Sequence, residues 1–146
     1  MIYYQKGNLL DAPEKIIVHG CNAQGVMGSG VAKAIRAKWP IAYHVYRKAY
    51  EEGEMCLGDI IPVHVDNKII VNAITQKFYG KDEKRYVDYN ALASCFLKID
   101  QLTSAEHETR IAMPRIGAGL GGGKWDIISW LIGKNLFNLD VIIYEL

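Results

Sequence analysis

The sequence predicts an α/β fold in which a mixed sheet lies between helices. Short runs of β-branched residues, typical of buried strands, alternate with segments whose apolar residues recur every three or four positions, as in amphipathic helices. At 146 residues the chain has the size of one domain, and it contains no internal repeat. Its apolar runs are far shorter than the roughly 20 residues that cross a bilayer. We therefore expect a globular protein with no membrane association.

Each element has its own signal in the sequence. A first helix is expected to bury Val31, Ile35 and Trp39 and to end at Pro40, and a second helix follows. A long helix over about 86–104 has an apolar stripe, and the last helix is expected over 126–136. The charged segment 77–85 is expected to be a surface loop. Strands are expected at 16–18, 60–65, 69–71, 110–116 and 140–145.

Charge and cysteine content exclude several classes of function. With 17 basic and 16 acidic side chains, the chain lacks the excess of positive charge typical of duplex nucleic-acid binding. The three cysteines are far apart and form no C-x-x-C pair, so neither a disulfide framework nor a zinc knuckle is indicated. The first residues lack the features of a secretory signal. We therefore expect a cytoplasmic protein that needs neither a metal nor a cofactor.

Two glycine-rich windows are the main clue to function. Each follows a predicted strand and precedes a predicted helix, where backbone N–H groups and the helix macrodipole favour anions. Two such loops could clamp a pyrophosphate. The alternative is that the glycines only make tight turns between a strand and a helix. Of the 14 glycines, nine lie in these windows: Gly20, Gly25, Gly28 and Gly30, then Gly117, Gly119, Gly121, Gly122 and Gly123.

The second window imitates two nucleotide-binding motifs without satisfying either. GAGLGG at 117–122 matches G-x-G-x-x-G, but the acid that should bind a ribose at the end of the next strand is absent, since Asp140 lies at its start. A P-loop also fails, because Trp125 follows Lys124 where Ser or Thr is required. Neither a Rossmann fold nor a P-loop is favoured.

The chain instead resembles the macro domains, in particular the small phosphatases that act on ADP-ribose 1''-phosphate. The motifs are YQKGNLL at 4–10, VHGCN at 18–22, GVMGSGVA at 25–32, MPRIGAGL at 113–120, Trp125 and the final strand. The resemblance implies a three-layer α/β/α sandwich with a mixed central sheet, formed by a single macro domain over residues 1–146. It also implies that ADP-ribose or ADP-ribose 1''-phosphate binds in a cleft at the ends of the central strands.

The same resemblance assigns roles to residues. Asn8 would lie near the adenine, Tyr144 would pack on the adenosine, and Asn22 would bond the distal ribose. The segment 25–31 would wrap that ribose and the phosphates, while 117–122 would hold the diphosphate from the other side. Ligand contacts are thus expected from Asn8, Leu9, Cys21, Gly25, Val26, Met27, Gly28, Ser29, Gly30, Val31, Thr75, Gln76, Gly117, Ala118, Gly119, Leu120, Gly121, Gly122 and Tyr144.

His19 and Asn22 are the expected catalytic residues. Small phosphatases of the family carry a His and an Asn beside the first loop, and an imidazole can pass a proton to a leaving group near neutral pH. The alternative for His19 is a hydrogen-bonded structural residue. Relatives that remove ADP-ribose from protein or DNA use a lysine directly after a threonine, but Gln76 follows Thr75 here, with Lys77 one residue further on.

The sequence therefore favours an ADP-ribose-1''-phosphate phosphatase. Two alternatives stay open. One is a reader that binds ADP-ribose without turnover, and the other is a mono-ADP-ribosyl hydrolase that acts on ADP-ribosylated protein or nucleic acid. Cys21 near a helix start could be a nucleophile, but a lone cysteine beside a strand is more often packed in the core.

Overall fold

A computed structural model describes residues 1–82 and 84–146, so Glu83, in the predicted loop 77–85, lies outside the described residues. The described residues form six strands, four α-helices and one short 3-10 helix, η1 (Leu9–Asp11). The strands are β1 (Ile2–Lys6), β2 (Ile16–Asn22), β3 (Ile60–Val65), β4 (Lys68–Gln76), β5 (Arg110–Met113) and β6 (Asp140–Glu145). The α-helices are α1 (Gly30–Lys38), α2 (Pro40–Glu51), α3 (Tyr89–Ala105) and α4 (Trp125–Asn135).

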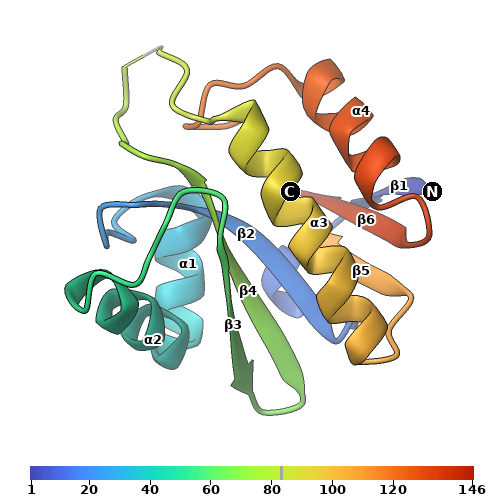
Figure 1. Cartoon of the computed structure of the whole chain (residues 1–146). Helices are drawn as coiled ribbons and strands as arrows, with labels where there is room; N and C mark the ends of the chain where they lie inside the picture. The colour runs from blue at the N-terminus through green and yellow to red at the C-terminus, as the bar shows by residue number, and fades with distance from the viewer. Residues whose placement is uncertain (83) are drawn as a thin grey trace.

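The strands form one mixed sheet in the order β1-β6-β5-β2-β4-β3 (Figure 1). β3 is antiparallel to β4, and the other neighbouring pairs are parallel. β2 lies between β5 and β4, because the chain crosses over through α1, α2 and β3 on one side and returns through α3 on the other. The mixed sheet predicted from the sequence is confirmed.

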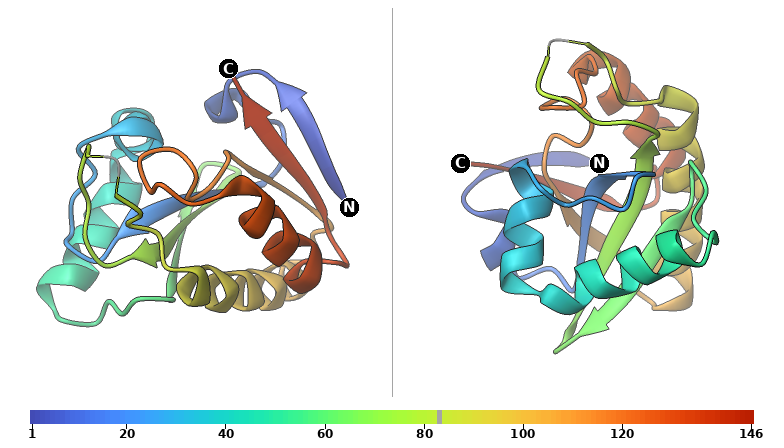
Figure 2. Two further views of the ribbon diagram at one scale, coloured as in Figure 1. Left: turned by 90° about the horizontal axis from the view of Figure 1, so that it is seen from above. Right: turned by 90° about the vertical axis from the view of Figure 1, so that its left-hand side faces the viewer.

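Helices cover both faces of this sheet. Ile16 and Val18 of β2 pack in a core with the apolar stripes of α3 and α4, whereas Ile17 packs against Ile35 and Trp39 on the side of α1. Successive side chains of a strand point to opposite faces, so a strand buried on both sides must be apolar throughout. The three layers are visible in Figure 2, and the predicted α/β/α sandwich is confirmed.

Three boundaries or faces differ from the sequence-based expectation. The strand expected over 110–116 ends at Met113, since Pro114 has no N–H to donate to the ladder. The long helix begins at Tyr89 instead of residue 86, where the Asp88 side chain caps it by accepting a hydrogen bond from the Ala91 N–H at 3.0 Å. Val31 was expected in a buried stripe but is 39% exposed.

The topology brings the carboxyl ends of β2, β4 and β5 to one edge of the sheet. In open α/β sheets, ligands bind outside the carboxyl ends of the strands, where neighbouring connections leave toward opposite faces. The chain leaves β2 toward α1 and leaves β4 toward α3, so a crevice is expected between these two connections. None of the described helices is both long and apolar enough to span a bilayer.

Candidate functional site

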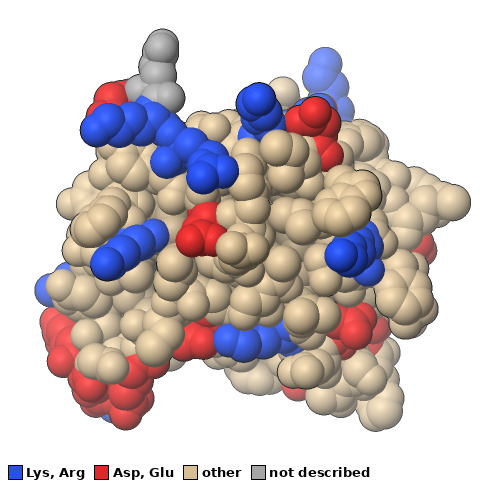
Figure 3. All heavy atoms as spheres, turned by 45° about the horizontal axis from the view of Figure 1, so that its top comes forward, with Lys and Arg blue, Asp and Glu red and all other residues tan. Residues whose placement is uncertain are grey.

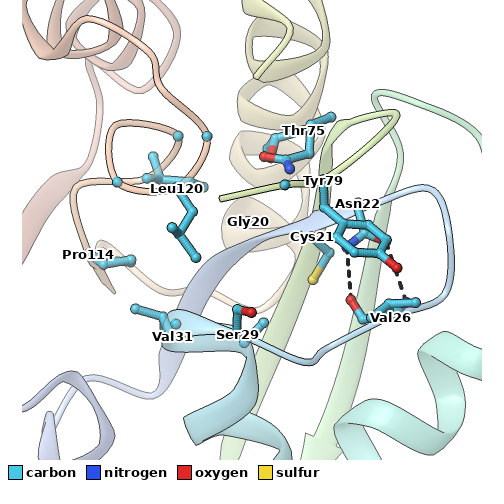
Figure 4. A pocket seen from close by; sticks show the side chains of 18 of the residues that line it. Gly20, Cys21, Asn22, Val26, Ser29, Val31, Thr75, Tyr79, Pro114 and Leu120 are labelled. Carbon is cyan, nitrogen blue, oxygen red and sulfur yellow. Dashed lines mark hydrogen bonds between the residues drawn. The ribbon is translucent and has the colours of Figure 1, made fainter. Parts of the chain in front are cut away.

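A cavity of about 690 Å³ opens at this edge of the sheet (Figure 4). Three segments line it: the end of β2 with the loop into α1, the end of β4 with the loop that follows, and the loop after β5. The lining residues are Gly20, Cys21, Asn22, Val26, Gly28, Ser29, Gly30, Val31, Ala32, Thr75, Gln76, Tyr79, Gly80, Lys81, Pro114, Arg115, Ile116, Gly117, Gly119, Leu120 and Gly121.

The two glycine-rich loops meet across this cavity. In Figure 4, Leu120 of the second loop points toward Ser29 and Val31 of the first. A Cβ placed on Gly30 would lie 3.6 Å from Cδ1 of Leu120, so the two loops are in van der Waals reach. The structure thus brings both windows predicted from the sequence to one site.

The side chain of Asn22 organises the first loop. Its Oδ1 accepts hydrogen bonds from the Gln24 N–H at 2.9 Å and from the Tyr46 hydroxyl at 2.9 Å, and its Nδ2 donates to the Val26 carbonyl at 2.8 Å. The Tyr46 hydroxyl also lies 2.5 Å from the Asn22 carbonyl oxygen. Burial raises the pKa of Tyr46, so this phenol stays protonated and keeps donating. Asn22 therefore holds the loop in shape from inside.

The first turn of α1 points into the same cavity. Gly28, Ser29, Gly30 and Val31 all line it, and α1 begins at Gly30. Within the described part of the chain, Ser29 makes no side-chain cap to this helix. The first amides of a helix lack partners inside the helix and carry partial positive charge, so they can hold phosphate oxygens.

The second loop is fixed by a residue in the left-handed region. Gly117 has φ of +77°, and a Cβ there would lie 2.8 Å from Cγ2 of Val87. Its carbonyl accepts a hydrogen bond from the Gly123 N–H at 2.8 Å, and the Gly121 carbonyl accepts from the N–H groups of Tyr86 and Val87 at 2.7 and 2.9 Å. The loop is therefore anchored to the segment before α3, and only glycine suits position 117.

Charged and aromatic side chains surround the mouth of the cavity. Tyr79 and Lys81 line it from the loop after β4, and Arg115 lines it from the loop after β5. Arg115 is ion-paired with Glu145 and lies over the ring of Trp125, 5.2 Å from its centroid. The edge where β4 ends comes forward in Figure 3, which shows Lys and Arg side chains gathered at its upper left. Anions approaching the cavity meet positive charge on this side.

His19 does not lie in the cavity. Its side chain is fully buried, and it is not among the lining residues within the part of the chain described. Nε2 donates to Oδ1 of Asn72 at 2.6 Å, and the Asn72 amide is oriented by donating from Nδ2 to the Ala42 carbonyl at 3.2 Å. Burial lowers the pKa of His19 to about 4. A neutral imidazole that is sealed from the cavity does not suit the expected role in proton transfer, and the structural alternative fits better.

Several other expected contacts lie outside the cavity. Asn8 caps η1 by accepting from the Leu10 N–H at 3.0 Å, and Tyr144 donates to Glu14 at 2.6 Å. Met27 points into a core cluster, because it is an apolar side chain that finds Cys21 and Tyr46 beneath the loop. The expected residues absent from the described lining are His19, Asn8, Leu9, Gly25, Met27, Ala118, Gly122 and Tyr144.

Some lining residues were not expected from the sequence. Pro114, Arg115 and Ile116 belong to the same motif as Gly117, so that motif was the available signal. Tyr79, Gly80 and Lys81 come from the segment assigned only to the surface, and their place depends on how the chain leaves β4. Gly20 and Ala32 complete the unexpected set.

The cavity lining has no general base of the usual kinds. Among its described members there is no Asp, Glu or His. Burial raises the pKa of the Cys21 thiol well above its usual value, so Cys21 stays protonated and is a poor nucleophile. In the described part of the chain, no three His, Cys, Asp or Glu side chains form a group that could hold a metal ion.

The matched sequences and structures agree with this geometry. A DNA ADP-ribosyl glycohydrolase from Thermus aquaticus is 31% identical over 99% of this chain, which covers only 41% of that relative. An ADP-ribose 1''-phosphate phosphatase from Scheffersomyces stipitis is 30% identical, over 97% of this chain and 100% of the relative. The solved macrodomain of Thermus aquaticus DarG has a TM-score of 0.85 at 28% identity, over 100% of this chain and 99% of that structure.

A family model describes the same region. The model of the Macro domain matches residues 18–129, from β2 to α4. This range contains all the residues that line the cavity. The chain belongs to the Macro domain family.

Proposed function

We propose that this chain binds ADP-ribose derivatives and hydrolyses ADP-ribose 1''-phosphate to ADP-ribose and inorganic phosphate. The observation that carries the proposal is one cavity of about 690 Å³ between two glycine-rich loops, beside the first turn of α1. Backbone amides at such a site suit a diphosphate. A relative with the printed name ADP-ribose 1''-phosphate phosphatase matches along its full length, which supports this choice of substrate.

In this proposal the ligand spans the cavity from loop to loop. The diphosphate is held between the first turn of α1 and the loop around Gly117, and the distal ribose lies toward the ends of β2 and β4. Asn22 keeps the first loop closed around that ribose. Lys81 adds a positive charge on the side where the ligand enters.

A lysine-based reaction is disfavoured by the residues at the end of β4. Gln76 lines the cavity at the position where the sequence comparison expected the lysine. Lys77 is exposed and is not among the described lining residues, and its ammonium group lies over the ring of Phe78, 5.4 Å from the centroid. Lys77 is therefore a poor substitute for a lysine inside the cavity.

A second candidate is a mono-ADP-ribosyl hydrolase that acts on nucleic acid or protein. The observation in its favour is the rim formed by the exposed residues Phe78, Tyr79 and Lys81, since aromatic rings and positive charge together suit a single-stranded nucleic acid. The Thermus aquaticus relative, with its printed DNA ADP-ribosyl glycohydrolase name, supports the same idea.

Turnover of defined substrates tests the proposal. Purified protein is incubated with ADP-ribose 1''-phosphate and, separately, with ADP-ribosylated single-stranded DNA and ADP-ribosylated protein. We expect release of phosphate from the first substrate. Release of ADP-ribose from DNA or protein alone would favour the second candidate. Binding of ADP-ribose by calorimetry with no turnover of any substrate would identify a non-catalytic reader.

A further inference from the structure

The end of β4 presents two consecutive side chains to the cavity. In a regular strand, neighbours point to opposite faces, but here Cys21 pairs with Ile74 and Asn22 pairs with Gln76, so Thr75 is the extra residue of a bulge. Both Thr75 and Gln76 line the cavity as a result. Bulges often redirect a side chain toward a site in this way.

Both side chains have hydrogen-bonding capacity that the protein leaves unused. Thr75 is 1% exposed, and among the described residues its Oγ1 has no hydrogen-bond partner. Nε2 of Gln76 donates to the Phe78 carbonyl at 2.8 Å, which orients the amide. Oε1 then faces the second loop, 3.2 Å from where a Cβ of Gly121 would stand. A buried hydroxyl without a partner is destabilising, so its retention calls for a reason.

These oxygens suit one kind of transition state better than another. Phosphoryl transfer needs cations and N–H donors around the phosphoryl oxygens, and an acceptor such as Oε1 of Gln76 would repel them. Cleavage at an anomeric carbon passes through an oxocarbenium-like state with positive charge, which oxygen acceptors stabilise. Arg115, a cation at the mouth, is already paired with Glu145. The floor of the cavity at β4 is therefore suited to reaction at carbon.

We propose that hydrolysis of ADP-ribose 1''-phosphate breaks the bond between C1'' and the bridging oxygen, with Thr75 and Gln76 positioning the attacking water. This inference rests on the proposed function. The water oxygen forms the new bond to C1'', and the C1''–O electron pair leaves with the phosphate. One hydrogen of the water stays on the anomeric hydroxyl, and the other ends on the phosphate.

The leaving group explains why no protein acid is needed. Phosphate has a second pKa near 6, so it departs as a stable anion without prior protonation. A carboxylate linked to C1'' departs as easily, whereas an alcohol does not. The cavity therefore suits ADP-ribosyl esters of acids as a substrate class. Phosphate release and ADP-ribosyl ester hydrolysis become one reaction at one carbon.

Isotope labelling identifies the bond that breaks. The protein is incubated with ADP-ribose 1''-phosphate in H2(18O), and the released phosphate is analysed by mass spectrometry. Reaction at C1'' yields phosphate without 18O, since the label goes to the sugar. One 18O atom per phosphate means attack at phosphorus and overturns the inference while the proposed function stands. No release of phosphate at all would reject both. Inorganic phosphate incubated with the protein in labelled water controls for exchange.

Variants of Thr75 test the positioning role separately. We expect Thr75→Val to lower kcat about tenfold or more, to change ADP-ribose affinity less than about threefold, and to leave Tm unchanged or raised. Thr75→Ser keeps the hydroxyl and should retain most of kcat. The control is Thr103→Val, because Thr103 is equally buried but donates to the Asp100 carbonyl at 2.9 Å. That control should lower Tm and leave kcat unchanged.

The outcomes of this series are distinct. A purely structural Thr75 would give a lower Tm in the valine variant together with any loss of kcat. Wild-type kcat in Thr75→Val would overturn the positioning role. Loss of kcat in both Thr75→Val and Thr75→Ser would also overturn it, since the hydroxyl would then not be the group that matters.

Discussion

Nε2 of His19 lies 2.6 Å from Oδ1 of Asn72, and both side chains are fully buried. Burial disfavours the charged imidazolium, so the pKa of His19 falls to about 4, while an exposed imidazole in the unfolded chain titrates near 6.5. As pH falls from 6.5 to 4, the unfolded chain binds a proton that the folded chain does not. The folded state is therefore penalised in this window.

The prediction is a loss of stability on acidification. We expect the free energy of unfolding to fall between about pH 6.5 and pH 4, with about 3 kcal/mol of the loss due to His19. Urea unfolding at several pH values measures it. His19→Gln should be less stable at neutral pH but show a shallower decline. Equal declines in the two proteins would contradict the assigned burial, and loss of turnover in a folded His19→Gln would restore a catalytic role.

The fold could be predicted from the sequence because its signals are local. Apolar runs such as 69–71 indicate strands covered on both faces, and the stripe that contains Leu92 and Phe96 indicates a helix over a sheet. The ends of elements were less certain. The long helix begins where Asp88 caps it, a detail that depends on one side chain.

The candidate site was predicted in part. Glycine-rich loops after β2 and β5 are visible in the sequence, and both lie at the cavity. The direction of a single side chain is not visible in this way. His19 turns under α2 because Asn72, 53 residues later, pairs with it, and Thr75 turns into the cavity because β4 has a bulge opposite β2. Both depend on register between strands that are distant in sequence.

Replacing Gly117 should destabilise the protein and the second loop. The residue has φ of +77°, and an added Cβ would lie 2.8 Å from Val87. We expect Gly117→Ala to lower the free energy of unfolding by about 2 kcal/mol and to weaken ADP-ribose binding. Gly133→Ala is the matched control, since the described structure places nothing within 4 Å of a Cβ there. In helix α4 that change should stabilise by up to about 1 kcal/mol. Similar behaviour of the two variants would refute the strain at position 117.

The hydroxyl of Tyr46 should matter to binding although it lies behind the loop. It donates to the carbonyl and to Oδ1 of Asn22, so Tyr46→Phe leaves buried acceptors without this donor. We expect a loss of about 1–3 kcal/mol in unfolding free energy and weaker ADP-ribose binding by calorimetry. Tyr43→Phe is the control, because it keeps the ring on which Arg36 stacks at 3.8 Å. Unchanged binding in Tyr46→Phe would show that the loop holds its shape without this bond.

Two lysines of the same loop should differ in their effect on ligand affinity. Lys81 lines the cavity, whereas Lys77 lies over the ring of Phe78 and outside the described lining. Lys81→Ala should weaken ADP-ribose binding about threefold to tenfold at low salt, and the difference should shrink at high salt, since exposed charges are screened. Lys77→Ala should bind like the wild type and retain turnover. If Lys77→Ala instead abolished turnover, Lys77 would have to reach the cavity in the bound state, and a lysine-dependent reaction would replace the one proposed.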